Sequence, residues 1–234
     1  MTIFAYHTHI AHGYPTLMTA LAVLENLPET LEVQAAVVGL ADQARLLLDG
    51  RTEAELPAIR AWRTAFSTMG LKPTQYRCAA EALLRRFRKD GTLPRVDPLV
   101  DLCNAVSAAH AVPVAAFDLD RIAGDLTVGP ATGAETYLTF GGQTEHPAPG
   151  EIVFADAAGT AHARRWTYRQ SAASAVSPTT GCALIVIEAL HEAAETDVTA
   201  VRDALGEIVR DHGASVRTGL LRSGAGNFDT GAAA

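Results

Sequence analysis

Residues 98–120 read PLVDLCNAVSAAHAVPVAAFDLD, and this stretch decides the fold. Its first half predicts a helix over Pro98–Ala109, with the proline in the first turn, where its missing backbone N–H leaves no hydrogen bond unmade. Its second half predicts an apolar strand over Val114–Phe117, which ends at the carboxylates Asp118 and Asp120. A helix with polar residues among its apolar ones, followed directly by a buried strand, is typical of a mixed helix–sheet protein.

The flanking sequence extends this pattern in both directions. Helical spacing of apolar residues predicts four further helices, at Leu17–Leu27, Thr52–Met69, Ala79–Phe87 and Asp197–His212, and a short one at Ala41–Leu48. Apolar and β-branched runs predict strands at Leu31–Val38, Asp125–Val128, Thr136–Phe140, Ile152–Ala155, Ala161–Thr167, Ala183–Ile187 and Val216–Leu221. The sequence therefore predicts an α+β fold with a mixed or antiparallel sheet. We expect a single domain over residues 1–224, with an N-terminal portion 1–60, a core 61–190 and a C-terminal helix and strand 191–222, followed by a disordered tail at 225–234.

Composition limits the possible functions. The chain has 234 residues, of which 48% are hydrophobic, and a net charge of −7, which argues against a general nucleic-acid binder and against DNA as a partner. Its three cysteines form no CxxC pair, so neither a disulfide framework nor a zinc knuckle is indicated. The N-terminal segment MTIFAYHTHI lacks the pattern of a secretory signal, and no apolar run is long enough to span a membrane. We therefore expect a cytoplasmic location.

One segment departs from the acidic average. Seven basic and two acidic residues lie between Lys72 and Arg95, a local charge of +5, so the rest of the chain carries −12. Most of these bases are arginines, which bind phosphates through a planar fork of donors. They are candidates for tRNA binding, at Arg77, Arg85, Arg88 and Arg95. A solvated helix face with ordinary ion pairs is the alternative.

Four motifs carry a resemblance that covers more than half of the chain. They are WRTAFSTMGLKPTQYR, EALLRRFRKDGTLPRVDPLVDLCNAVS, PVAAFDLDRI and the pair ARRWTYRQS and GCALIVIEAL. In this order they resemble the B3/B4 tRNA-editing domain of the bacterial phenylalanyl-tRNA synthetase beta subunit, and they are most similar to free-standing relatives of that domain. The resemblance implies an editing-domain-like α+β fold around a pocket for an aminoacyl group. It also implies hydrolysis of the ester that joins a wrong amino acid to tRNA.

The resemblance also implies roles for particular residues. Ala115 stands where the synthetase has a histidine, so the same mechanism cannot be assumed. Glu188 stands at the end of a late core strand, where the synthetase carries a glutamate that helps to recognise the amino acid. The glycine-rich loop of the synthetase is replaced here by WTYRQS, with Trp166, Arg169 and Gln170, which implies a pocket lined for a different side chain.

The chemistry of an activated ester narrows the candidates further. Its hydrolysis needs an aligned water, an anchor for the ammonium group and donors for the developing oxyanion, but no covalent nucleophile. Glu188 and Asn104 are our catalytic candidates, with Ala115, Asp118, Trp166, Arg169 and Gln170 as substrate-binding residues. Asn104 can instead support the helix through a hydrogen bond, Asp118 can form a turn, and Glu188 can lie in solvent at a strand end. His7, His9 and His12 lack a carboxylate or cysteine to complete a metal site, so we expect no metal and no cofactor.

Three functions agree with this sequence. The first is a deacylase that hydrolyses misacylated tRNA in trans. The second is a binding module that keeps the fold without hydrolysis, and the substitution at Ala115 favours it. The third is a hydrolase of a small free aminoacyl compound, which the acidic net charge favours. The sequence does not determine the oligomeric state.

Overall fold

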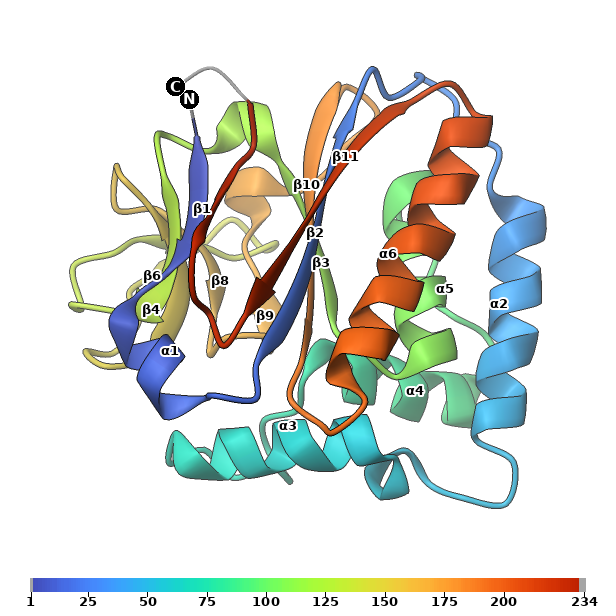
Figure 1. Ribbon diagram of the computed structural model, residues 1–234, viewed down its shortest axis with the longest axis horizontal. Helices are drawn as coiled ribbons and strands as arrows, with labels where there is room; N and C mark the ends of the chain where they lie inside the picture. The colour runs from blue at the N-terminus through green and yellow to red at the C-terminus, as the bar shows by residue number, and fades with distance from the viewer. Residues whose placement is uncertain (1, 232–234) are drawn as a thin grey trace.

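A four-stranded antiparallel sheet forms the centre of the molecule. In the computed structural model, which describes residues 2–231, its strand order is β11–β2–β10–β3 (Figure 1). These strands span Ser215–Arg222, Met18–Glu25, Cys182–Ala189 and Val114–Asp118. Strands β2 and β10 lie inside the sheet and are buried on both faces, which explains their nearly continuous apolar sequences.

A second sheet lies against the first on the left of Figure 1. Its strand order is β12–β1–β4–β7–β8–β9, and the strands span Asn227–Asp229, Ile3–Tyr6, Leu126–Pro130, Ile152–Asp156, Ala161–Arg164 and Arg169–Gln170. Strands β1 and β4 are parallel, while every other pair is antiparallel. The structure therefore confirms the predicted α+β class with mixed and antiparallel sheets.

Helices cover the opposite face of the central sheet. They are α5 and α6, at Pro98–His110 and Ala194–Asp211, and α2 (Gln34–Leu47) packs on α5; all three occupy the right of Figure 1. Helices α3 (Pro57–Thr68) and α4 (Ala79–Asp90) lie below them. The remaining elements are short, namely α1 (Thr8–Gly13), β5 (Tyr137–Leu138), β6 (Thr144–Glu145) and the 3-10 turns η1 (Glu53–Glu55), η2 (Leu119–Arg121) and η3 (Ala172–Ser174).

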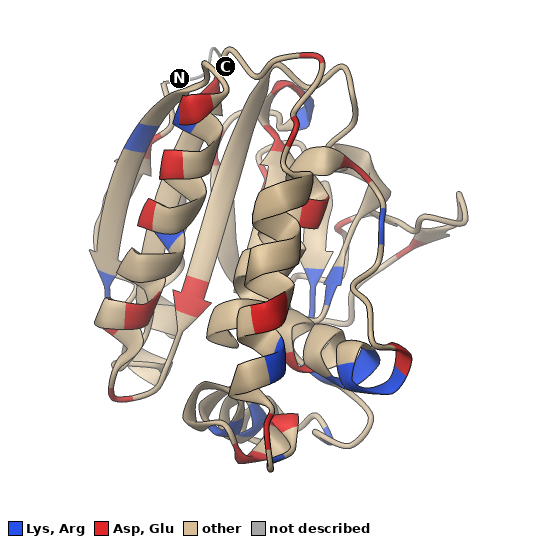
Figure 2. Cartoon of the chain, turned by 90° about the vertical axis from the view of Figure 1, so that its right-hand side faces the viewer, with Lys and Arg blue, Asp and Glu red and all other residues tan. Residues whose placement is uncertain are grey.

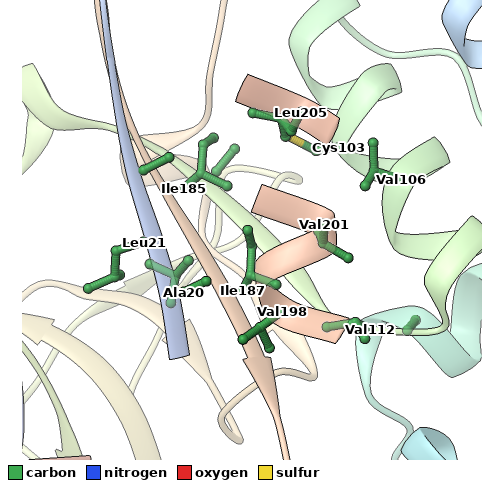
Figure 3. Packing of buried hydrophobic residues seen from close by; sticks show 14 of the residues in the cluster. Ala20, Leu21, Cys103, Val106, Val112, Ile185, Ile187, Val198, Val201 and Leu205 are labelled. Atoms are coloured by element: carbon green, nitrogen blue, oxygen red, sulfur yellow. The ribbon is translucent and has the colours of Figure 1, made fainter. Parts of the chain in front are cut away.

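The main core lies between the central sheet and the helices. In Figure 3, Ile185 and Ile187 of β10 point toward Val198 and Val201 of α6, with Val106 of α5 beyond them. All five side chains are almost completely buried. The same apolar cluster extends from Phe4 to Leu221, so the two sheets and the helices share one core.

Three local predictions were wrong. Leu17–Leu27 was predicted as a helix, because Met, Ala, Leu and Glu favour helices, but it contains strand β2. Leu31–Val38 was predicted as a strand, but helix α2 begins within it. The tail predicted to be disordered from residue 225 contains β12, whose residues 227–229 pair with β1. Residues 232–234 of that tail lie outside the described part of the chain.

No helix among residues 2–231 combines the length and the apolar character needed to cross a membrane.

Candidate active site

A pocket opens between the two sheets, where β3, β10 and the segment after β8 meet. It encloses about 400 Å³, including its open mouth. Most of its wall is apolar, and its polar groups come from the segment 167–170 and from β10. The lining residues are Ala79, Pro113, Val114, Ala115, Phe154, Ala163, Trp166, Thr167, Tyr168, Arg169, Gln170, Val186 and Glu188.

Glu188 is the only carboxylate among these lining residues. It follows the buried apolar run of β10, which carries it between the two sheets, and it is 2% exposed. Its Oε1 accepts a hydrogen bond from the Tyr6 hydroxyl at 2.6 Å and another from the Trp166 indole N–H at 2.7 Å. Within residues 2–231 no hydrogen bond reaches Oε2, which leaves that oxygen for a ligand or a water.

Burial raises the pKa of Glu188 from 4.5 to about 7. The hydrogen bonds from Tyr6 and Trp166 act in the opposite direction, because they stabilise the ionised form. The carboxyl group is thus poised to exchange a proton near neutral pH, which suits general acid–base chemistry. The pKa of Tyr6 is raised well above 10, first by burial and then by the charge of Glu188, so the phenol keeps its proton.

A tight turn brings Trp166 to this carboxylate. Strand β8 ends at Arg164, and the next two residues adopt left-handed backbone angles, with φ of 48° at Arg165 and 56° at Trp166. Such angles are uncommon for side chains of this size and occur where the surrounding structure enforces them. The Trp166 ring is fully buried and packs edge-on against Trp62 at 5.0 Å and Tyr14 at 4.7 Å. The predicted strand over Ala161–Thr167 therefore ends early, and its residues do not alternate between two faces.

Tyrosine and arginine side chains cluster around Tyr168, which lies on the pocket wall. The Arg165 guanidinium lies 4.8 Å from the ring centre of Tyr76 and 5.7 Å from that of Tyr168. The Arg169 guanidinium lies 6.0 Å from the ring centre of Tyr168 on the pocket wall. Arg169 is exposed and forms no ion pair with any residue from 2 to 231, whereas Arg165 lies 3.8 Å from Glu151. These rings and cations form a surface on which a planar, anionic ligand can stack.

Five of the predicted site residues meet at this pocket. They are Ala115, Trp166, Arg169, Gln170 and Glu188. The Gln170 amide donates to the backbone oxygen of Ala116 at 2.5 Å, so this side chain fixes β9 against the edge of β3.

Two predicted site residues do not line the pocket. Asn104 lies half-buried on α5, in the helix layer on the other face of the central sheet. Asp118 lies at the end of β3, four residues beyond Val114 at the pocket. It accepts hydrogen bonds from the Thr180 hydroxyl at 2.8 Å and the Asp120 backbone at 3.1 Å. Asp118 therefore forms the turn that was the alternative to a cleft role.

Each predicted tRNA-binding arginine has an acidic partner, although Arg85 and Arg88 share one carboxylate. Glu53, which is 2% exposed, lies 2.9 Å from Arg88 and 3.5 Å from Arg85. The other two pairs are Arg77 with Glu81 at 3.5 Å and Arg95 with Asp101 at 2.8 Å. Figure 2 shows blue and red positions mixed on the helices at the bottom of the view. The four arginines thus form the ion pairs of the alternative, while Arg85 and Arg95 stay more than half exposed, and tRNA binding by them stays a prediction.

Sequence reasoning missed Tyr6 and Thr19, which lie far from the motif set. Both are buried, and their hydroxyl oxygens are 2.7 Å apart. Among the N-terminal histidines, the His7 ring accepts a hydrogen bond from the His9 backbone N–H at the start of α1. Among residues 2–231, no group of three or more His, Cys, Asp or Glu side chains is arranged to hold a metal.

Comparison with known families identifies the domain. The family model of the B3/4 domain matches residues 61–203, which is more than half of the chain. The chain belongs to the B3/4 domain family. This assignment confirms the resemblance to the B3/B4 domain that the motifs indicated.

One solved structure similar to this B3/4 domain protein is an N-terminal fragment of the phenylalanyl-tRNA synthetase beta-subunit from Pyrococcus horikoshii. The identity is 11% and the TM-score 0.48, and the match covers 92% of this chain and 49% of that fragment. This chain thus spans about half the length of the fragment. No curated protein matches it.

Parts of the pocket's surroundings lie outside the matched B3/4 residues. Tyr6, Tyr14 and Thr19 all precede residue 61, yet they contact Glu188, Trp166 and Tyr6 respectively. The N-terminal strands are therefore part of the structure that holds the site.

Proposed function

We propose that this protein is an aminoacyl-tRNA deacylase that hydrolyses the ester of misacylated tRNA in trans. One observation carries the proposal, namely a buried carboxyl group in an apolar pocket, with a pKa of about 7 and with one oxygen that accepts no hydrogen bond from residues 2–231. Membership of the B3/4 domain family supports tRNA as the substrate class.

In the proposed reaction, the ionised Glu188 removes a proton from a water held at Oε2. The water oxygen bonds to the ester carbonyl carbon, and the tetrahedral intermediate then releases the ribose oxygen. The leaving oxygen takes up the proton, so one water is consumed and a free amino acid and an RNA hydroxyl are produced. Proton transfer by a positioned side chain contributes about 10²–10⁴-fold to such reactions. In this proposal Glu188 takes part in the chemistry. Ala115, which stands where the synthetase has a histidine, has no side-chain group that could do so.

In this proposal the end of the RNA enters the pocket past the side chains of Tyr76, Tyr168 and Arg169. Tyr76 and Tyr168 offer ring faces for a base, and Arg169 offers a cation without an acidic partner among residues 2–231. Stacking of this kind contributes about 1–3 kcal/mol per base. Arg77, Arg85, Arg88 and Arg95 have weaker support as tRNA contacts, because each is paired with a carboxylate.

A second candidate is a hydrolase of a small free aminoacyl ester. The pairing of the four arginines favours it, together with the net charge of −7. Salt separates the two candidates, since binding through phosphates weakens steeply with salt and binding of a small ester in the pocket does not.

The decisive experiment is a deacylation assay over a panel of misacylated tRNAs, with the free aminoacyl methyl esters in parallel. We expect at least one tRNA to be deacylated, with a kcat/KM that falls as salt rises. Turnover of the free esters alone would favour the second candidate. Saturable tRNA binding without any hydrolysis would instead identify a binding module.

A further inference from the structure

A chain of hydroxyl groups leads from β2 through β1 to Glu188. Strand β1 alternates between partly and fully buried residues, which turns Phe4 and Tyr6 toward the central sheet. The Tyr6 ring packs edge-on against Phe4 at 5.3 Å. Gly224, with a φ of +60°, lies so close that an added Cβ would be 3.2 Å from that of Tyr6. The phenol is therefore held firmly in place.

Thr19 supports the phenol from the neighbouring strand. Thr19 of β2 and Glu188 of β10 are direct cross-strand partners, so both side chains leave the same face of the sheet. A phenol has one proton, and Tyr6 donates it to Glu188 at 2.6 Å. The Thr19 hydroxyl, 2.7 Å from the phenol oxygen, must then donate to Tyr6. The two hydrogen bonds point in one direction, toward the carboxylate.

Tyr6 does not line the pocket, so it reaches a substrate only through Glu188. Tyr6 and Trp166 both donate to Oε1, so Oε2 is the oxygen that accepts no hydrogen bond from residues 2–231. We propose that Tyr6, oriented by Thr19, is a positioning residue that keeps Glu188 ionised and leaves Oε2 for the reacting water. The catalytic part of this inference rests on the proposed function, but the effect on the carboxyl group does not.

Few other groups affect this carboxyl group. The pKa of Glu188 reflects burial, Tyr6 and Trp166, and no charged side chain contributes. The remaining titratable residues on the pocket wall are Tyr168 and Arg169, and neither forms a hydrogen bond with Glu188. Removal of the Tyr6 hydroxyl therefore tests one interaction almost in isolation.

The test compares Tyr6→Phe with Tyr14→Phe. Both variants lose one phenol oxygen near the site, but the Tyr14 hydroxyl makes no hydrogen bond within residues 2–231, and its ring only packs on Trp166. There are two readouts. The first is the titration of the Glu188 side chain, monitored by carbon NMR of labelled glutamate, with the signal assigned by means of Glu188→Gln. The second is the pH dependence of kcat/KM. Circular dichroism verifies folding.

We expect Tyr6→Phe to raise the midpoint of both curves by about one pH unit, since a hydrogen bond to a charged group is lost. At pH 7 the ionised share of Glu188 then falls from about half to about one tenth, so kcat/KM falls about fivefold and recovers above pH 9. Tyr14→Phe leaves the midpoint where it is, and Thr19→Val raises it by less than Tyr6→Phe.

An unchanged midpoint in folded Tyr6→Phe overturns the inference. Should that variant not fold, an unchanged midpoint in Thr19→Val overturns it instead. A wild-type protein without deacylase activity refutes the proposed function alone, because the NMR titration still reports whether Tyr6 acts on Glu188.

Discussion

Replacement of Glu188 by Gln should stabilise the protein above neutral pH and strongly reduce its turnover. The variant keeps the shape of the side chain, and its amide oxygen can still accept from Tyr6 and Trp166. The folded state raises the pKa of Glu188 from 4.5 to about 7, so it favours the protonated form more than the unfolded chain does. This group therefore costs nothing below pH 4.5, and it lowers the free energy of unfolding as pH rises toward 7.

The size of the effect follows from the same values. A difference of about 2.5 pH units corresponds to about 3 kcal/mol, and Glu188 is fully buried, so no correction for solvent exposure applies. Above pH 7.5 we expect Glu188→Gln to unfold with a free energy about 3 kcal/mol higher than the wild type. At pH 4.5 the two should agree. Turnover should fall about 100-fold or more, as expected for loss of a general base.

Urea denaturation at pH 4.5, 6 and 8 measures this difference, with Glu207→Gln as the matched control on the exposed face of α6. The control should follow the wild type at every pH. If the Glu188→Gln variant is no more stable than the wild type at pH 8, the folded state does not raise the pKa of Glu188, and the reasoning is refuted. Full activity in that variant refutes its catalytic role.

Three further predictions concern the arginines and Asn104. Replacing Arg85 and Arg88 together by Ala should lower the free energy of unfolding by roughly 1–3 kcal/mol, because both ion-pair partners of the buried Glu53 are lost. Urea denaturation measures this loss, and the additional change Glu53→Gln should restore stability. Arg169→Ala should weaken tRNA binding and reduce the salt slope by about one, measured by fluorescence anisotropy, with unfolding unchanged within about 0.5 kcal/mol. Asn104→Ala should change kcat/KM less than twofold in the deacylation assay, and a larger loss in a stable variant would contradict its placement away from the pocket.

Local sequence predicted the elements whose environment matches their pattern. The helix at Pro98–His110 and the strand at Val114–Asp118 were both predicted within one residue, because each has the periodicity of its own burial. Strand β2, MTALAVLE, was not, since it lies between two other strands and is buried on both faces. Apolar and polar residues do not alternate along such a strand. Most of its residues, namely Met, Ala, Leu and Glu, individually favour helices.

The site shows the same limit at longer range. Glu188 and Trp166 belong to recognisable motifs, so they were found. Tyr6 lies 182 positions from Glu188, and its role depends on the pairing of β1 with β4 and on the packing of the two sheets. The segment IFAY is apolar throughout, so its sequence does not indicate that Phe4 and Tyr6 are the residues that face inward. Nothing in a single sequence indicates which buried carboxylate such a phenol will meet.

Arg77, in the basic run from Lys72 to Arg95, contributes to the fold beside the pocket. Glu81, at the start of α4, is buried and binds Arg63 at 2.6 Å, with Arg77 at 3.5 Å. These pairs fix the first turn of α4, where the Ala79 backbone N–H donates to the Thr167 oxygen at 2.8 Å. Thr167 directly follows Trp166, so α4 holds the turn that delivers the indole to Glu188. One arginine of the predicted RNA-binding set, Arg77, thus also helps to hold the wall of the site, whatever the others bind.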